Sequence, residues 1–148
     1  MLQEGDSAPE DIELEDQNGD LVKLADFKGQ RLVVYFYPKD DTPGCTTEAK
    51  NFRDNVQTYE DAGIKIIGIS ADSVASHKKF ATKYDLPFTI LSDPEKIAIQ
   101  TFGAWENNKI KRRTWLINAD WQIEKVYEDV SPAAHDGELC AFYGLQKP

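Results

Sequence analysis

The fold is decided by residues 31–70, which read RLVVYFYPKDDTPGCTTEAKNFRDNVQTYEDAGIKIIGIS. Residues 31–37 and 64–70 are short runs of β-branched, aliphatic and aromatic side chains, a pattern that predicts strands buried on both faces. Between them, apolar side chains recur every three or four positions over residues 49–59, which predicts a helix that begins near Cys45. A strand, a helix and a strand in this order predict a βαβ unit with parallel strands.

The flanking segments extend this unit into a mixed sheet. Further helices are expected over residues 73–84, after Asp93-Pro94 toward Phe102, and over 132–142, and hairpins over 11–24 and 114–127. No internal repeat or linker-like stretch interrupts the chain. The predicted fold class is therefore α/β, a single domain over residues 1–148 with a central mixed β-sheet and helices on both faces.

Composition limits the classes of function. The chain has 148 residues, 41% of them hydrophobic, so it can bury a core of its own. Its formal charge of −9 would repel a phosphate backbone and an anionic membrane surface, so neither nucleic acid nor a membrane is an expected partner. No apolar run is long enough to span a bilayer, and the acidic N-terminus does not look like a signal peptide, so a cytoplasmic location is expected.

Soft metal ligands are scarce in this sequence. It contains two cysteines, Cys45 and Cys140, and two histidines, His77 and His135. These are too few for a disulfide framework or a four-sulfur zinc site, and we expect neither a metal nor another cofactor. We expect His77 at the surface, because charged residues surround it, and His135 in a capping or packing role.

The loop between the first buried strand and the first long helix contains the chemically informative residues. Cys45 lies in the first turn of the predicted helix, where the macrodipole and unpaired backbone N–H groups favour a thiolate, so we expect a nucleophile. Thr42 can direct its hydroxyl at the sulfur or at a bound oxygen, and Pro38 and Pro43 stiffen the loop. The alternative is that Cys45 is a small buried apolar residue.

Pro38, Thr42 and Cys45 form a P-x-x-x-T-x-x-C pattern that resembles the active-site signature of peroxiredoxins. The longer stretch over residues 36–48, FYPKDDTPGCTTE, is similar to the Q-type branch, the bacterioferritin comigratory proteins. The start of the chain, GDSAP at residues 5–9, also resembles this family. The resemblance covers nearly the whole chain and implies a thioredoxin-like fold.

The resemblance implies a thiol peroxidase that reduces hydrogen peroxide and organic hydroperoxides. In such an enzyme, the thiolate of Cys45 attacks a peroxide oxygen and becomes a sulfenic acid. Attack requires hydrogen-bond donors on the peroxide, which the resemblance assigns to Thr42 and to the backbone amides of Gly44 and Cys45, with Pro38 shielding the loop. It also assigns to Glu48 a supporting role, the ordering of the loop or of a nearby arginine.

The family also supplies an arginine from a distant strand, in an Arg-x-x-aromatic-apolar-Ile-Asp pattern. Residues 112–118, RRTWLIN, fit this pattern and would place Arg112 on Cys45. Side chains alternate along a strand, so Arg113 is the alternative if the register differs by one residue. A second alternative is that the basic cluster around Arg112 is merely solvated.

The sequence departs from the family pattern at the resolving cysteine. Many Q-type members have the resolving cysteine five residues after the first cysteine, where this chain has Lys50. Another branch has it in the helix after the second strand, but the helix predicted over 73–84 contains no cysteine. Cys140 is a possible internal resolving residue, although Leu139, Cys140 and Phe142 also fit the apolar side of a helix.

The favoured cycle is therefore a one-cysteine cycle. Its reductant would be an external thiol such as thioredoxin, glutaredoxin or a low-molecular-weight thiol, and we expect a monomer. The alternatives are a cycle with a Cys45–Cys140 disulfide and a non-enzymatic redox sensor or binding module. A thioredoxin-type dithiol oxidoreductase is disfavoured, because the sequence has no Cys-x-x-Cys.

Overall fold

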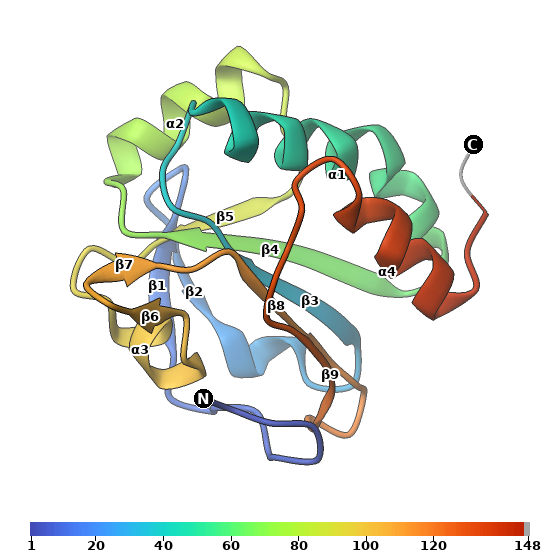
Figure 1. The fold of residues 1–148 in the computed structure, drawn as a ribbon. Coiled ribbons are helices and arrows are strands. Elements are labelled where there is room, and N and C mark those ends of the chain that lie inside the picture. Colours follow the sequence, from blue (N-terminus) through green and yellow to red (C-terminus); the bar gives the residue numbers. More distant parts are fainter. Residues whose placement is uncertain (147–148) are drawn as a thin grey trace.

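A seven-stranded sheet runs through the middle of the computed structural model, which describes residues 1–146 (Figure 1). The strand order is β2-β1-β5-β4-β3-β8-β9. These strands are β1 (Glu13–Asp16), β2 (Leu21–Lys23), β3 (Arg31–Phe36), β4 (Ile64–Ser70), β5 (Thr89–Ser92), β8 (Arg113–Ile117) and β9 (Ile123–Tyr127). A separate small hairpin pairs β6 (Trp105–Glu106) with β7 (Lys109–Ile110).

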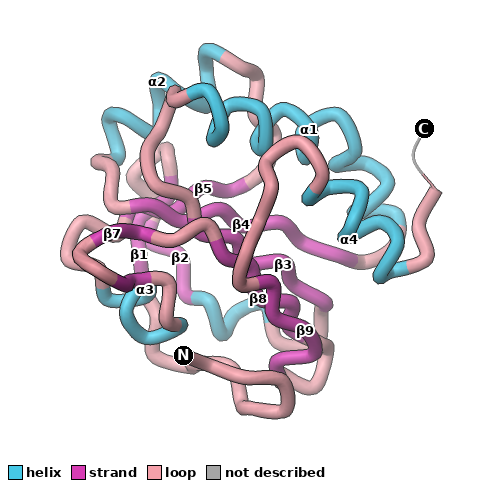
Figure 2. The backbone as a smooth tube through the Cα atoms, viewed as in Figure 1, coloured by secondary structure: helices cyan, strands magenta, loops and turns pink. Residues whose placement is uncertain are grey.

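Helices pack on both faces of the sheet, as Figures 1 and 2 show. The long helices α1, α2 and α4 cover one face, while α3 and the 3-10 helix η1 lie on the other. Their bounds are η1 (Leu24–Phe27), α1 (Pro43–Asp61), α2 (Val74–Lys83), α3 (Ile97–Phe102) and α4 (His135–Tyr143). Within residues 1–146, no helix is both long and apolar enough to cross a bilayer.

The sheet is mixed, as the sequence predicts. β3 pairs with β4 in parallel, and β4 pairs with β5 in parallel, whereas β8 runs antiparallel to β3. The side chains of β3 and β4 are almost all buried, because helices cover both faces of these inner strands. The carboxyl ends of β3, β4 and β5 therefore meet at one edge of the sheet, and the loop that leads from β3 to α1 begins there.

Alternate side chains of the inner strands pack into two separate apolar clusters, one on each face of the sheet. Tyr35 packs with Phe52 of α1 and with the faces of α2 and α4. Its neighbour Phe36 points the other way and packs with Phe102 of α3 and Trp115 of β8. The period-two alternation of a strand explains this division, and it places Cys45 in the same cluster as Tyr35.

The helix starts differ from prediction in two places. α3 begins at Ile97 and not directly after Pro94, because Asp93 accepts hydrogen bonds from the backbone N–H groups of Ile97 and Ile99 across a turn in which Lys96 takes a φ of 59°. α4 begins at His135, three residues later than expected. The sequence patterns did not single out β5, which contains only four residues.

Candidate active site

Cys45 is the third residue of α1, directly after the loop that leaves the carboxyl end of β3. Thr42 precedes the helix with extended backbone angles, and its carbonyl accepts the first helical hydrogen bond, from Thr46. The N–H groups of the first helical turn have no partner within the helix, so they are available to an anion or a polar oxygen. Cys45 itself is only 2% exposed, which isolates the thiol from bulk water.

Arg112 lies against the sulfur. Its Nη2 donates a hydrogen bond to Cys45 Sγ at 3.3 Å, and its Nη1 donates to Glu48 Oε1 at 2.8 Å. The register of the sheet explains this approach: β8 pairs with β3 so that Arg113 lies opposite Phe36, and the residue before β8 therefore arrives beside the β3–α1 loop. A fixed positive charge next to the sulfur stabilises a thiolate there.

Arg113, the alternative to Arg112, points elsewhere. Its Nη1 donates to the carbonyl oxygen of Gly103 at 2.7 Å, and its Nη2 donates to Glu106 Oε2 at 2.5 Å. Adjacent residues on an extended backbone face opposite sides, so only one of the two arginines can reach Cys45. The structure brings Arg112 to the sulfur and leaves Arg113 with Gly103 and Glu106.

Glu48 holds the arginine from one helical turn after the cysteine. It is 1% exposed, and burial raises the pKa of its carboxyl to about 7, although the positive charge of Arg112 acts in the opposite direction. Burial alone would lower the pKa of Arg112, but Glu48 and Cys45 raise it, so the guanidinium stays charged. Only Oε1 of Glu48 has a hydrogen-bond partner among the described residues.

Gly44 leaves the space that the guanidinium occupies. A Cβ atom at this position would lie 3.1 Å from Arg112 Nη2 and 3.4 Å from Pro132 Cγ. The first distance is shorter than an ordinary van der Waals contact, and Arg112 cannot easily retreat because Glu48 and Cys45 hold it. Glycine therefore allows Arg112 to lie directly over the start of α1.

Thr42 is close in sequence to Cys45, but its hydroxyl hydrogen has another acceptor. The Thr42 hydroxyl donates to the carbonyl oxygen of Lys39 at 2.8 Å. The hydroxyl hydrogen is therefore directed at Lys39 and not at the sulfur or a peroxide oxygen, which differs from the donor role expected for Thr42. A hydroxyl oxygen that donates its hydrogen still has lone pairs that can accept a hydrogen bond, for example from a peroxide O–H. Pro38 is exposed at the start of the loop, and Pro43 is the first residue of α1, a position that tolerates proline because no helical N–H is needed there.

A surface cavity of about 540 Å³ lies beside Arg112. It is polar, and residues around β8 and the segment before α4 form its wall. These residues are Glu106, Lys111, Arg112, Arg113, Glu128, Asp129, Val130 and Ser131. Since Arg112 belongs both to this wall and to the contact with Cys45, the cavity is the route by which we expect a small polar molecule to approach the arginine.

Cys140 does not lie beside Cys45. The Sγ atom of Cys140, on α4, is 3.6 Å from the hydroxyl of Tyr59 and 3.9 Å from Asp136 Oδ1. Tyr59 follows Cys45 by 59 − 45 = 14 positions on the same helix α1, which corresponds to about 21 Å along the axis. The two cysteines are both buried and are not joined in a disulfide. Lys50 is exposed on α1.

The prediction that His77 is a surface residue is wrong. Its side chain is 0% exposed, because it lies three residues before Phe80 and four before Ala81, on the buried face of α2. His135 is also buried, and burial lowers the pKa of its ring. It packs edge-on against Phe52, in agreement with its expected packing role.

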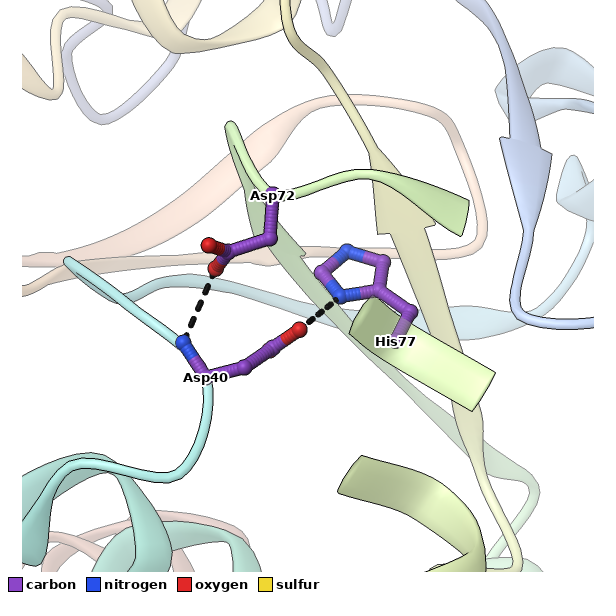
Figure 3. A group of neighbouring side chains, drawn as sticks. All are labelled: Asp40, Asp72 and His77. Carbon is purple, nitrogen blue, oxygen red and sulfur yellow. Dashed lines mark hydrogen bonds and ion pairs between the residues drawn. The ribbon is translucent and has the colours of Figure 1, made fainter. Parts of the chain in front are cut away.

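His77 belongs to a polar cluster with Asp40, which is also buried, and with Asp72, which is half-buried, as shown in Figure 3. One potential metal-ligand atom from each residue lies within 4.8 Å of the others. However, His77 Nδ1 is 2.6 Å from Asp40 Oδ2, whereas two ligands of one tetrahedral ion are more than about 3 Å apart. This geometry fits a shared proton and not a bound ion. The sequence patterns did not predict this cluster. His77 lies three residues before Phe80, and this helical spacing could have placed it on the buried face of α2.

Comparisons with known proteins identify the family of this chain. Residues 5–126 match the AhpC/TSA family. The chain is 42% identical over 142 residues to peroxiredoxin Bcp of Bacillus subtilis, with 90% of each chain covered, and it has the same identity and coverage with peroxiredoxin Bcp of Escherichia coli K12. It is 47% identical over 145 residues to a putative chloroplastic peroxiredoxin Q of Oryza sativa, covering 93% of this chain and 64% of the rice protein.

Solved structures have the same fold. A mutant of PrxQ from Xylella fastidiosa superimposes with a TM-score of 0.94 at 29% identity, covering 97% of this chain and 96% of that one. The bacterioferritin comigratory protein of Xanthomonas campestris gives a TM-score of 0.90 at 31% identity, covering 96% and 98%. The thioredoxin-like fold implied by the loop signature is thereby confirmed. The chain belongs to the AhpC/TSA family, in the branch that contains peroxiredoxin Bcp and peroxiredoxin Q.

Proposed function

We propose that this protein is a thiol-dependent peroxidase that reduces hydrogen peroxide and organic hydroperoxides with the thiolate of Cys45. One observation carries the proposal: the guanidinium of Arg112 donates to a cysteine sulfur in the first turn of a helix, at 3.3 Å. Family membership supports it. The Xanthomonas campestris relative is described by its alkyl peroxide reduction activity, which supports organic hydroperoxides as substrates.

The first step forms a sulfur–oxygen bond and breaks the oxygen–oxygen bond. The thiolate of Cys45 attacks the hydroxyl oxygen of the peroxide, so that the sulfur becomes a sulfenic acid. The other oxygen leaves as an alkoxide or hydroxide and takes up one proton to become an alcohol or water. The sulfur loses two electrons and the peroxide gains them, and no metal or organic cofactor is needed.

Residues around Cys45 have distinct roles in this step. Arg112 stabilises the thiolate and the negative charge that develops on the leaving oxygen. The backbone N–H groups of Gly44 and Cys45 donate to the peroxide oxygens, and Thr42 accepts from the peroxide O–H. Glu48 positions Arg112 through their 2.8 Å contact. Pro38 limits the freedom of the loop before Thr42.

The second step uses an external thiol. The thiol attacks the sulfenic sulfur and releases water, which leaves a mixed disulfide, and a second thiol then restores Cys45 and carries away the disulfide. Two features support this one-cysteine cycle: Lys50 stands where many relatives have a resolving cysteine, and Cys140 lies beside Tyr59, about 21 Å along α1 from Cys45.

The reductant and the setting follow from the chemistry of thiols. Thioredoxin, glutaredoxin or a low-molecular-weight thiol can each supply the two electrons of the second step. A cycle that returns a cysteine to its thiol requires a reducing compartment, so we place the protein in the cytoplasm. We infer that it works as a monomer, because the contacts of Arg112 with Cys45 and Glu48 are complete without a residue from a second subunit.

The test compares two cysteine variants in a peroxide-consumption assay with dithiothreitol as the reductant. We expect Cys45→Ser to lose activity completely and Cys140→Ser to retain most of it. Mass spectrometry after one equivalent of peroxide should find a sulfenic acid at Cys45 and a thiol at Cys140. Full activity in Cys45→Ser would refute the proposal, and a Cys45–Cys140 disulfide would refute the one-cysteine cycle.

A further inference from the structure

The loop before Cys45 is attached to α2 by a buried carboxylate. Asp40 Oδ2 accepts a hydrogen bond from the Ser76 hydroxyl at 2.8 Å and lies 2.6 Å from His77 Nδ1. Its Oδ1 accepts from the hydroxyl of Tyr37 at 2.6 Å, and its backbone N–H donates to Asp72 Oδ2 at 2.8 Å. Figure 3 shows the contacts that Asp40 makes from the loop with Asp72 and with His77. All four contacts fix the backbone two residues before Thr42.

The ring of His77 connects this carboxylate to the sheet. Its Nδ1 faces Asp40, and its Nε2 lies 2.9 Å from the carbonyl oxygen of Leu91 in β5. A carbonyl oxygen can only accept, so Nε2 carries a hydrogen, and one further proton lies between Nδ1 and the carboxylate. The pair is therefore neutral overall, and the side chains of His77 and Asp40 are 0% and 3% exposed.

This attachment differs from a second one that the same loop makes at the surface. Asp41 accepts hydrogen bonds from Lys83 Nζ at 2.8 Å and from the Tyr84 hydroxyl at 2.6 Å. Asp41 and Lys83 are largely exposed, and such ion pairs contribute little to stability. A buried polar pair that loses one partner leaves the other unsatisfied, which costs far more. The Asp40–His77 pair is thus the stronger of the two attachments.

The proposed reaction makes opposite demands on this loop. A peroxide is small and meets Cys45 while Arg112 is in contact with the sulfur. A thiol reductant must approach the sulfur in line with its S–O bond, and a sulfur in a residue that is 2% exposed offers no such path. The loop must therefore be closed for oxidation and displaced for reduction.

We propose that His77, acting through Asp40, is a positioning residue that keeps the catalytic loop closed. The proposal rests on the peroxidase function proposed above. Asp40 belongs to the loop, whereas His77 lies on α2 and touches neither the sulfur nor Arg112 in any contact described for residues 1–146. Loss of the His77 hydrogen bond should free the loop, so that oxidation slows while reactions that need access to Cys45 accelerate.

The test uses two substitutions of similar shape at one position. In His77→Asn, the side-chain amide can still donate to Asp40, whereas His77→Leu has no donor. Stopped-flow measurements give the rate constant for oxidation of Cys45 by hydrogen peroxide. Mass spectrometry of the Cys45 peptide gives the rate of its alkylation by a bulky maleimide, which reports access to the sulfur.

For His77→Leu we expect oxidation to be at least about tenfold slower, and alkylation at least about threefold faster, than in the original protein. His77→Asn should recover much of both rates. Ser76→Ala removes one weaker donor to Asp40 and should change both rates in the same directions by less, which keeps the test valid if His77→Leu does not fold.

Two controls separate positioning from general instability. Lys83→Met removes the ion pair of the exposed attachment and leaves the Tyr84 hydrogen bond in place, and Leu24→Ala weakens the core on the opposite face of the sheet. Both should keep the original rates. If both rates fall together in His77→Leu, or if neither changes, the inference is wrong while the peroxidase function stands. If the original protein consumes no peroxide, the proposed function fails, and the alkylation rates still test the attachment.

Discussion

Arg112 is the residue whose shape matters most. Its two terminal nitrogens are used separately, one on Cys45 and one on Glu48. Only a planar guanidinium with several fixed donors can make both contacts from one side chain, whereas a lysine offers a single point charge. Gly44 supports this arrangement, because a side chain there would push the guanidinium away.

The first prediction concerns the two neighbouring arginines. We expect Arg112→Lys to reduce the rate constant for Cys45 oxidation by about 10²–10³, the usual cost of losing one donor to a transition state. Arg113→Lys should change it less than about threefold, because Arg113 contacts Gly103 and Glu106. Stopped-flow oxidation by hydrogen peroxide measures both. Equal losses in the two variants would show that the contact with the sulfur is not what matters.

The second prediction concerns Glu48. Burial raises the pKa of this carboxyl from 4.5 to about 7, so the folded protein binds a proton there more tightly than the unfolded chain does. The stability that this proton contributes is complete below pH 4.5 and is lost as the pH rises through about 7. The loss is on the order of a few kcal/mol, since each pKa unit corresponds to about 1.4 kcal/mol.

Glu48→Gln should remove this dependence. Urea unfolding at pH 5 and pH 8 is expected to show that the variant gains stability relative to the original protein as the pH rises. The same comparison in a Cys45→Ser background excludes titration of the thiol as the cause. If the stability difference between Glu48→Gln and its parent is the same at both pH values, Glu48 does not titrate in this range.

At the scale of the elements, β3 and β4 are closely packed in the apolar cluster that also contains Cys45. Tyr35 lies opposite Gly68 in the parallel register, and a Cβ atom at Gly68 would lie 2.8 Å from Tyr35 Cζ. The Tyr35 hydroxyl is buried and has no hydrogen-bond partner among the described residues, and burial raises its pKa. The ring is needed for packing, whereas the hydroxyl costs stability.

The third prediction uses this pair. Gly68→Ala should destabilise the protein by roughly 1–3 kcal/mol, because the ring has no space to retreat. Tyr35→Phe keeps the ring, removes the unpaired hydroxyl and should be neutral or stabilising by up to about 1 kcal/mol. Urea unfolding at pH 7 measures both. A destabilised Tyr35→Phe would indicate that the hydroxyl has a partner such as a bound water.

At the scale of the whole molecule, net charge governs the approach of reductants. The formal charge is −9, while the cavity beside Arg112 is lined by three basic and three acidic residues and is close to neutral by itself. The field that a distant anion meets is therefore set by the rest of the surface, and it is repulsive. Salt screens this field over about 10 Å at 0.1 M ionic strength.

The fourth prediction compares two small thiols as reductants of the sulfenic acid. The rate with anionic 2-mercaptoethanesulfonate should rise several-fold between about 10 mM and 300 mM salt, because screening weakens the repulsion. The rate with neutral 2-mercaptoethanol should stay nearly constant and serves as the control. A fall with salt for the anionic thiol would mean that the basic residues near Arg112 dominate its approach.

Local patterns predicted most of the elements. The apolar run at 64–70 coincides with β4, and the hairpin and helix periodicities place β1, β2, α1 and α2 within a few residues. β5 was missed because four residues carry too little pattern, and the start of α3 shifted because Asp93 caps the helix from a distance. At the site, the loop signature pointed to Cys45 and Thr42, whereas strand alternation left Arg112 and Arg113 as alternatives until the register of β8 was known.

The sequence by itself determined the mixed α/β fold, the family and the place of Cys45 in the first turn of a helix, because periodicity and the loop signature are local properties of the chain. Only the tertiary structure decided which residues meet. Strand register brought Arg112 to the sulfur, helix length separated Cys140 from it, and the packing of α2 buried His77 against Asp40. Contacts between residues distant in sequence depend on the packing of whole elements, which no short pattern specifies.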